Sequence, residues 1–162
     1  MRYFLDTEYI ETERAVDLVS IGVVAEDGRE LYAISTEFDP APANDFVRTV
    51  VFPALEPRDH PAWMTRDAIR RRLRDFVADD IPSFCCWGGA AYDWWATVQL
   101  FPLPERVPDG WKYSAYDVMQ LAEQAGMATD PIDPQLPAPP PDAHHALVDA
   151  RWTRRVYDVL AR

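Results

Sequence analysis

Residues 1–38 of the chain read MRYFLDTEYIETERAVDLVSIGVVAEDGRELYAISTEF. Three runs in this stretch, residues 2–10, Leu18–Ala25 and Leu31–Phe38, are rich in the β-branched and aromatic residues that favour β-strands. Asp27-Gly28, between the second and third runs, is a hairpin signal. The opening of the chain therefore predicts an antiparallel meander of three strands.

The rest of the chain predicts helices with one more buried strand among them. Thr65 is placed to cap a helix that runs to about Val77, and Gly126 to close another. The short apolar run Ser83–Trp87 ends in two glycines and is typical of a buried strand. Further helices are expected at about Asp45–Val51, Tyr92–Phe101, Asp117–Ala125 and, with Asp142 as its cap, Ala143–Leu160. Strands first and helices later indicate an α/β or α+β fold in a single domain, residues 1–162.

The composition is that of a globular protein. Of the 162 residues, 48% are apolar, and no apolar run approaches the roughly 20 residues that would span a bilayer. The N-terminus has no charged-then-apolar leader, so we expect a cytoplasmic protein that does not enter membranes. Cys85 and Cys86 are adjacent in an apolar run, which favours two buried core residues over a disulfide or a zinc site.

The formal net charge of −11 is unfavourable for holding long nucleic acids, because such affinity comes largely from basic side chains on phosphates. An acidic chain remains compatible with an enzyme whose carboxylates bind divalent cations. The arginines gather in two clusters, within residues 70–74 and 151–155. Each cluster indicates a solvated helix face, with phosphate contact as the alternative.

Asp6 and Glu8 are the first candidates for a chemical site. Side chains two apart in a strand point to the same face, so both carboxylates project together with Phe4, opposite Tyr3 and Leu5. Two carboxylates without a basic neighbour repel each other, and a divalent cation would remove that cost. The alternative is a strand end that enters solvent.

Asp93 is a third candidate carboxylate. It follows Gly88-Gly89-Ala90-Ala91-Tyr92 near the start of a predicted helix. Glycines there let a ligand or a second backbone approach closely. The alternative is an aspartate that only favours the helix dipole.

His144 and Asp149 form the last candidate pair. Residues five apart are roughly 140° apart around a helix, so the two converge only if His144 lies on a loop. The proline-rich stretch 131–141 directly upstream predicts such a loop. A loop histidine beside a carboxylate on a helix suits a general base next to a metal ligand, with a surface or capping role as the alternative.

In this order the three pieces resemble the motifs of the DEDDh 3′–5′ exonucleases, a family of the ribonuclease H-like superfamily that includes oligoribonuclease and RNase T. Asp6-Thr7-Glu8 resembles the first motif, Ala90-Ala91-Tyr92-Asp93 the second, and the segment from His144 to Asp149 the third. The stretch Tyr92-Asp93-Trp94-Trp95 makes the chain most similar to the small actinobacterial exoribonucleases of this superfamily. The motifs extend over nearly the whole chain.

The resemblance implies a ribonuclease H-like α/β fold, in which a mixed β-sheet opens with an antiparallel meander and is flanked by α-helices. It also implies two divalent ions, Mg²⁺ or Mn²⁺, held by Asp6, Glu8, Asp93 and Asp149. His144 would take the proton from the attacking water, with His145 as the alternative base. The implied reaction removes nucleotides one at a time from RNA 3′ ends, as nucleoside 5′-monophosphates.

The same resemblance implies that the terminal nucleotide lies against Thr7, Tyr9 and Ile10, where Tyr9 could stack on its base. The residues after Glu8 are Tyr-Ile-Glu, whereas most of the family has small residues with a glycine there. The implied partners are RNA 3′ ends or short oligoribonucleotides, and a homodimer is possible because relatives often dimerise. DNA trimming and a metal-dependent phosphohydrolase of small nucleotides are the alternatives. A non-catalytic binding module is disfavoured, because all five functional residues are present.

Overall fold

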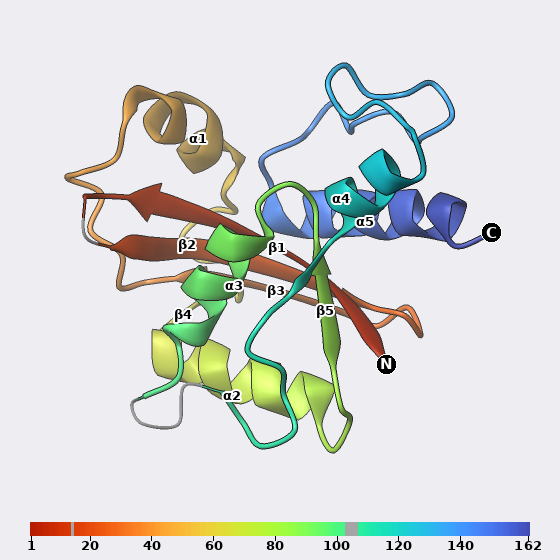
Figure 1. The fold of residues 1–162 in the computed structure, drawn as a ribbon. Coiled ribbons are helices and arrows are strands. Elements are labelled where there is room, and N and C mark those ends of the chain that lie inside the picture. Colours follow the sequence, from red (N-terminus) through yellow and green to blue (C-terminus); the bar gives the residue numbers. More distant parts are fainter. Residues whose placement is uncertain (14, 103–106) are drawn as a thin grey trace.

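A six-stranded mixed sheet forms the centre of the molecule, with strand order β4-β3-β2-β1-β5-β6 (Figure 1). The computed structural model describes residues 1–13, 15–102 and 107–162. β1 (Arg2–Glu11), β2 (Val16–Ala25) and β3 (Glu30–Ser35) pair antiparallel, so the predicted meander is confirmed. β3 ends at Ser35 and not at Phe38, because the Ser35 hydroxyl accepts a hydrogen bond from the Glu37 amide and turns the chain.

Three strands pair in parallel with the meander or with each other. β5 (Ser83–Cys86) lies beside β1, β6 (Tyr116–Asp117) beside β5, and β4 (Trp63–Met64) beside β3. β4 and β6 were not predicted, because two residues are too few to show an alternating pattern. The mixed sheet with flanking helices confirms the predicted fold class.

Helices cover both faces of this sheet (Figure 1). α2 (Arg66–Val77) and α3 (Ala90–Val98) lie on one face, and α4 (Val118–Gln124) and α5 (Ala146–Leu160) on the other. A π-helical turn, Val47–Val51, continues into α1 (Phe52–Ala54) beside the end of β1. In the described part of the chain, no helix combines the length and the apolar character that crossing a membrane requires.

Alternation along the first half of β1 separates two of the hydrophobic clusters of the core. Tyr3 and Leu5 pack with residues of α2 and α3, whereas Phe4 packs with residues of α4 and α5. Cys85 and Cys86 on β5 are separated in the same way, and both are free and buried, as predicted. Because Asp6 and Glu8 follow Phe4 at intervals of two, their side chains lie on the α5 side of the sheet.

The start of α5 differs from its prediction. The helix begins at Ala146, three residues later than expected, because His144 has a left-handed backbone (φ 71°) that interrupts a right-handed helix. Asp142 is therefore not the cap. His145 occupies the N-cap without a side-chain capping bond, and Asp149 reaches back to accept a hydrogen bond from the His144 amide.

The ends of α2 and α4 agree with the sequence, and those of α3 do not. Thr65 caps α2 by accepting a hydrogen bond from the Ala68 amide, and Gly126 follows α4 with φ 79°. α3 starts at Ala90, two residues earlier than expected, and stops at Val98. The Gln99 amide still bonds four residues back, to Trp95, but the Leu100 and Phe101 amides bond only three residues back, in tighter turns that do not continue the α-helix.

Candidate active site

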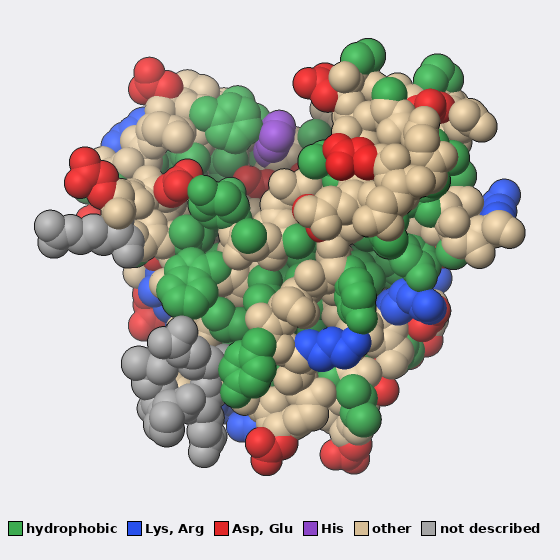
Figure 2. All heavy atoms as spheres, in the orientation of Figure 1, with side chains coloured by type: hydrophobic (Ala, Val, Ile, Leu, Met, Phe, Trp, Pro, Cys, Tyr) green, Lys and Arg blue, Asp and Glu red, His purple; other side chains and the backbone are tan. Residues whose placement is uncertain are grey.

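The three predicted motifs meet in one pocket of about 570 Å³, next to β1 and the first turn of α5. Figure 2 shows the molecule hollowed between the segment that carries α1 and the loop above α4. The predicted site residues that line the pocket are Asp6, Thr7, Glu8, Tyr9, Asp93, His144 and Asp149. Residues far apart in sequence are therefore brought together as the resemblance implied.

The β1 carboxylates lie beneath α5 because β2 carries a glycine at the crossing point. Gly22 pairs directly with Asp6, and a Cβ atom on Gly22 would lie 2.3 Å from the backbone of Ala146. Only a residue without a side chain lets the first turn of α5 rest on the sheet here. That contact brings Asp149 to the carboxylates of β1, and no sequence motif marked Gly22 for this role.

Asp93 joins α3 to β1. Its side chain is buried, with 4% exposed, and Oδ1 accepts hydrogen bonds from the Thr7 amide at 3.0 Å and the Thr7 hydroxyl at 2.7 Å. A Cβ atom on Gly89 would lie 3.2 Å from Asp93 Oδ2, so this glycine leaves room for the Asp93 carboxylate itself. Both features fix the Asp93 carboxylate at the pocket wall.

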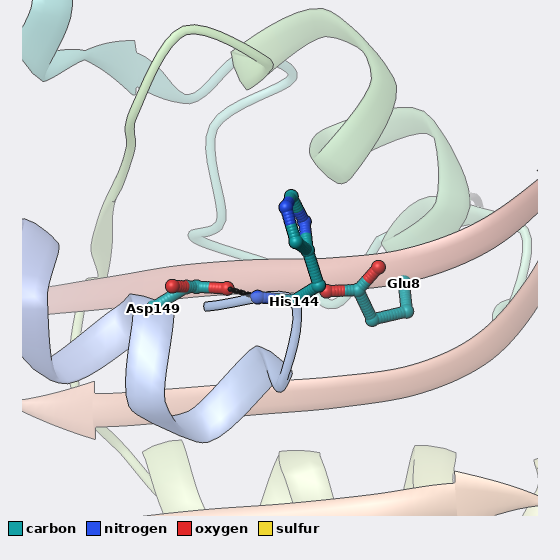
Figure 3. Close-up of side chains that lie close together, drawn as sticks. All are labelled: Glu8, His144 and Asp149. Carbon is teal, nitrogen blue, oxygen red and sulfur yellow. Dashed lines mark hydrogen bonds between the residues drawn. The ribbon is translucent and has the colours of Figure 1, made fainter. Parts of the chain in front are cut away.

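Glu8, His144 and Asp149 lie closest together. Figure 3 shows Glu8 on β1, Asp149 on the first turn of α5, and the His144 imidazole rising between their carboxylates. One potential ligand atom from each of the three side chains lies within 4.8 Å of the others, so the group could hold a metal ion. The His144 amide donates a hydrogen bond to Asp149 Oδ2 at 2.7 Å, which ties the loop to the helix.

Each of the four carboxylates has a raised pKa. Burial raises the pKa of Glu8 to about 8, and the charges of Asp149 and Asp93 contribute to that shift. Burial also raises the pKa of Asp93 to about 7, although both Thr7 hydrogen bonds lower it.

The pKa values of the other two carboxylates shift in the same direction. Asp6 keeps some contact with the open pocket, but burial of its carboxylate is the main reason that its pKa lies well above the usual value. The charges of Asp93 and Glu8 raise it further. Burial raises the pKa of Asp149 as well, and the His144 amide opposes that shift.

The residues described around this pocket include no lysine or arginine. Arg70 and Arg71 pair with Asp67 along α2, and Arg151 pairs with Glu30, so these members of the two clusters lie on helix faces. Oxygen ligands without a competing ammonium or guanidinium group suit hard divalent cations. A bound cation would also favour the ionised carboxylates, whose pKa values are now raised chiefly by burial and further by neighbouring carboxylate charges. The residues present therefore fit a divalent-metal site.

Aromatic side chains form the walls of the pocket. Tyr9 stacks on Tyr92 with ring centroids 5.6 Å apart and planes at 5°, and Phe46 packs edge-on to the His144 ring at 4.8 Å. Ile10 is buried behind this wall, in a cluster with residues of the π-helical turn. Sequence reasoning missed Phe46, because an aromatic residue in a short predicted helix carries no pattern that separates a pocket wall from ordinary packing.

A mixed sheet that opens with a meander, with acidic residues and a histidine gathered beside its first strand, defines the class of ribonuclease H-like nucleases. Within that class the chain belongs to the family of the 3′–5′ exoribonuclease Rv2179c-like domain, whose family model matches residues 1–161. The 3′–5′ exoribonuclease Rv2179c of Mycobacterium tuberculosis (strain H37Rv) is 44% identical over 163 residues, which cover 99% of this chain and 93% of that protein.

Solved structures of exonuclease I share the fold. The enzyme from Methylocaldum szegediense superposes with a TM-score of 0.69 at 14% identity, over 99% of this chain. A second exonuclease I structure, whose description concerns how processivity is achieved, gives 0.64 at 13% identity. This chain spans 40% of the length of each. The predicted resemblance to ribonuclease H-like exonucleases is confirmed.

Proposed function

We propose that this protein hydrolyses RNA from the 3′ end, one nucleotide at a time, and releases nucleoside 5′-monophosphates with the help of divalent cations. The proposal rests chiefly on the pocket in which four carboxylates lie together without a lysine or arginine in the described lining. Such a pocket repels a phosphodiester until cations neutralise it. The relative named 3′–5′ exoribonuclease, at 44% identity, supports RNA as the substrate and the 3′ end as the starting point.

The cations would be held by Asp6, Glu8, Asp93 and Asp149. Their oxygen atoms are the ligands that Mg²⁺ and Mn²⁺ prefer. Two such ions, when bound, would stabilise the negative charge that develops on the attacking and leaving oxygens at phosphorus. Thr7 has a supporting role, because its two hydrogen bonds orient the Asp93 carboxylate.

His144 is the general base in this proposal. The oxygen of a water molecule bonds to phosphorus, a proton of that water passes to a ring nitrogen of His144, and the bond from phosphorus to the 3′ oxygen breaks. The hydrogen bond from the His144 backbone amide to Asp149 and the edge-on contact with Phe46 hold the imidazole in the pocket. Such orientation of a base is worth orders of magnitude in rate.

Tyr9 provides the surface on which the terminal base would stack. Tyr92 covers one face of its ring, so Tyr9 lines the pocket as a supported wall. Ile10 supports this region from behind, through its packing with Val47 and Val51. Stacking on an aromatic ring accepts any base, which suits an enzyme that removes successive nucleotides.

The proposal is tested with 5′-labelled RNA and DNA oligonucleotides of the same sequence, with and without Mg²⁺ or Mn²⁺. We expect RNA to shorten in single-nucleotide steps only when metal is present. Asp149→Ala should abolish the ladder. The matched control is Asp142→Ala, which removes an exposed carboxylate from the loop before α5, outside this pocket, and should keep the ladder.

The other outcomes have distinct meanings. Equal or faster shortening of DNA would overturn RNA as the substrate class. If neither polymer shortens but a small nucleotide ester is hydrolysed in the presence of metal, the protein is a phosphohydrolase and not an exonuclease. Shortening that Asp149→Ala leaves intact would remove this pocket from the reaction.

A further inference from the structure

A tyrosine on β3 packs against the loop that carries His144. The ring of Tyr32 stacks on the ring of His145, with centroids 4.4 Å apart and planes at 24°. Tyr32 pairs with Gly22 across the sheet, and Gly22 pairs with Asp6. Gly22 provides the space for the first turn of α5, and Tyr32 borders that space on the side away from Asp6.

Tyr32 and His145 are in contact through their rings and not through a hydrogen bond. The Tyr32 hydroxyl and His145 Nδ1 are buried, and neither has a hydrogen-bond partner among the described residues. Burial raises the pKa of Tyr32, and the nearby Ser20 hydroxyl opposes this shift without reaching hydrogen-bond geometry. His145 gives α5 no side-chain capping bond and is not among the residues described as lining the active-site pocket. Its ring is therefore placed by stacking.

His144 needs support from its neighbours. A left-handed backbone is unfavourable for a residue with a side chain and persists only where the surroundings impose it. The hydrogen bond from the His144 amide to Asp149 holds the N-terminal side of this residue. The peptide on its other side leads into His145, whose ring is stacked on Tyr32.

We infer that Tyr32 is a positioning residue of the nuclease: by stacking on His145 it holds the preceding residue, His144, in the pocket. The inference rests on the role given to His144 in the proposed function. It also assigns His145 a structural role, because a stacked ring outside the pocket lining does not reach the attacking water.

The test measures kcat and KM for RNA shortening in four variants. Tyr32→Ala should lower kcat by about 10- to 100-fold, the scale of a misplaced catalytic group, with KM little changed. Tyr32→Phe and His145→Phe keep a stacked ring and should retain kcat near the wild-type value. The control is Glu30→Gln, which removes the carboxylate charge that ties the same strand to α5 through the 2.7 and 2.6 Å bonds with Arg151. It should leave kcat unchanged.

A double-mutant cycle separates positioning from loss of structure. If Tyr32 acts through His145, then Tyr32→Ala combined with His145→Ala should lose no more kcat than either single variant. If Tyr32→Ala does not fold, Tyr32→Leu and His145→Leu remove the planar ring with less loss of volume and take its place in the cycle.

Three results would overturn the inference. The first is that loss of the Tyr32 ring leaves kcat intact while His144→Ala abolishes it, an outcome that leaves the proposed function standing. The second is an inactive His145→Phe, which would require imidazole chemistry at that position. The third is a loss of kcat in Glu30→Gln as large as in Tyr32→Ala. If His144→Ala itself kept full kcat, the proposed base would be the part that fails.

Discussion

His144 shows how much a single residue of this site depends on its surroundings. Its φ of 71° lies in a region that costs a residue with a side chain about 1–3 kcal/mol. Strain of this kind gathers at functional sites, where neighbouring contacts impose it. Here the hydrogen bond to Asp149 and the edge-on contact with Phe46 hold the residue so that its ring stands between two carboxylates.

His144→Ala separates the two roles that its position allows. As a general base, it should cost about 10²- to 10⁴-fold in kcat and leave Mn²⁺ affinity largely unchanged, since the carboxylates remain. Calorimetric titration with Mn²⁺ and single-turnover kinetics measure both quantities. His60→Ala, at an exposed histidine outside this pocket, is the control and should change neither. A collapse of Mn²⁺ affinity in His144→Ala would instead make His144 a ligand, which its proximity to Glu8 and Asp149 also permits.

Thr7→Val tests the tie between β1 and α3. The substitution keeps the hydrogen bond from the backbone amide of residue 7 to Asp93 but removes the 2.7 Å hydrogen bond from the Thr7 hydroxyl. Because that bond lowers the pKa of Asp93, its loss should move this pKa further above about 7. Mn²⁺ affinity should then fall at pH 7 and recover at higher pH, which a series of titrations would show. The control is Thr97→Val, which removes a hydroxyl that donates a hydrogen bond to the backbone carbonyl of Asp93 and not to its carboxylate, and which should leave the pH dependence as it is. An unchanged pH dependence in Thr7→Val would contradict the prediction.

At the scale of elements, the parts that the sequence predicted are those with a local pattern. The alternation on β1 placed Asp6 and Glu8 on one face. The five-residue step required His144 to lie on a loop if it meets Asp149, and the structure places it there although the helix was expected from about Ala143. Gly22 and Tyr32 could not be found in this way. Their importance comes from α5, which is more than 110 residues away along the chain. The two-residue strands β4 and β6 depend equally on distant pairing partners.

Gly22→Ala tests whether β2 determines where α5 begins. The added methyl would overlap the backbone of Ala146, so the first turn of α5 must move away from β1. We expect kcat to fall by about 100-fold, since small displacements of catalytic groups have effects of this size. The free energy of unfolding should fall by about 1–3 kcal/mol, as for overpacking. Activity assays and urea denaturation measure the two effects.

Gly126→Ala is the matched control for Gly22→Ala. It strains a left-handed glycine after α4, with no heavy atom beyond its chain neighbours within 4 Å of the added methyl. It should therefore cost about 1 kcal/mol of stability without loss of kcat. Equal kcat values for the two variants would show that α5 does not depend on the space above Gly22.

Ala78→Gly is predicted to stabilise the end of α2. Ala78 caps this helix with φ 53° and ψ −131°, a region populated almost only by glycine. Relief of that strain should raise the free energy of unfolding by about 1 kcal/mol, after the entropic cost of glycine is subtracted. Urea denaturation would show it, and kcat should stay constant, since α2 lies on the sheet face opposite α5. A loss of stability in Ala78→Gly would mean that the backbone at Ala78 is not strained in the native protein.

At the scale of the whole molecule, the net charge of −11 is compatible with the nuclease fold because the carboxylates have two kinds of surroundings. Exposed carboxylates such as Glu26 and Asp67 pair with arginines, whereas four carboxylates meet in the pocket without a lysine or arginine in its described lining. The single domain, predicted from the pattern of strands and helices, and the homodimer, implied by the resemblance, both stay predictions. The concentrated charge has a consequence for stability.

Without metal, stability should fall as pH rises. The pKa of Glu8 is raised from 4.5 to about 8, so between these values the folded state holds a proton that the unfolded chain has released. Asp93, with a pKa of about 7, acts in the same direction. Because the folded state binds more protons across this window, the free energy of unfolding decreases from about pH 5 to pH 8. Thermal unfolding in a chelator should show a lower Tm at pH 8 than at pH 5.

Metal should reverse that loss, because a ligand that binds only the folded state stabilises it. Adding Mg²⁺ or Mn²⁺ should raise Tm more at pH 8, where the carboxylates are ionised, than at pH 5. Glu8→Gln removes one of the raised groups, so it should be more stable than the wild type at pH 8 in chelator and gain less from metal. Glu26→Gln, at an exposed carboxylate whose pKa its Arg2 partner lowers, is the matched control and should show neither effect. A Tm that does not depend on pH in chelator would mean that the pKa values of Glu8 and Asp93 are not raised in the metal-free fold.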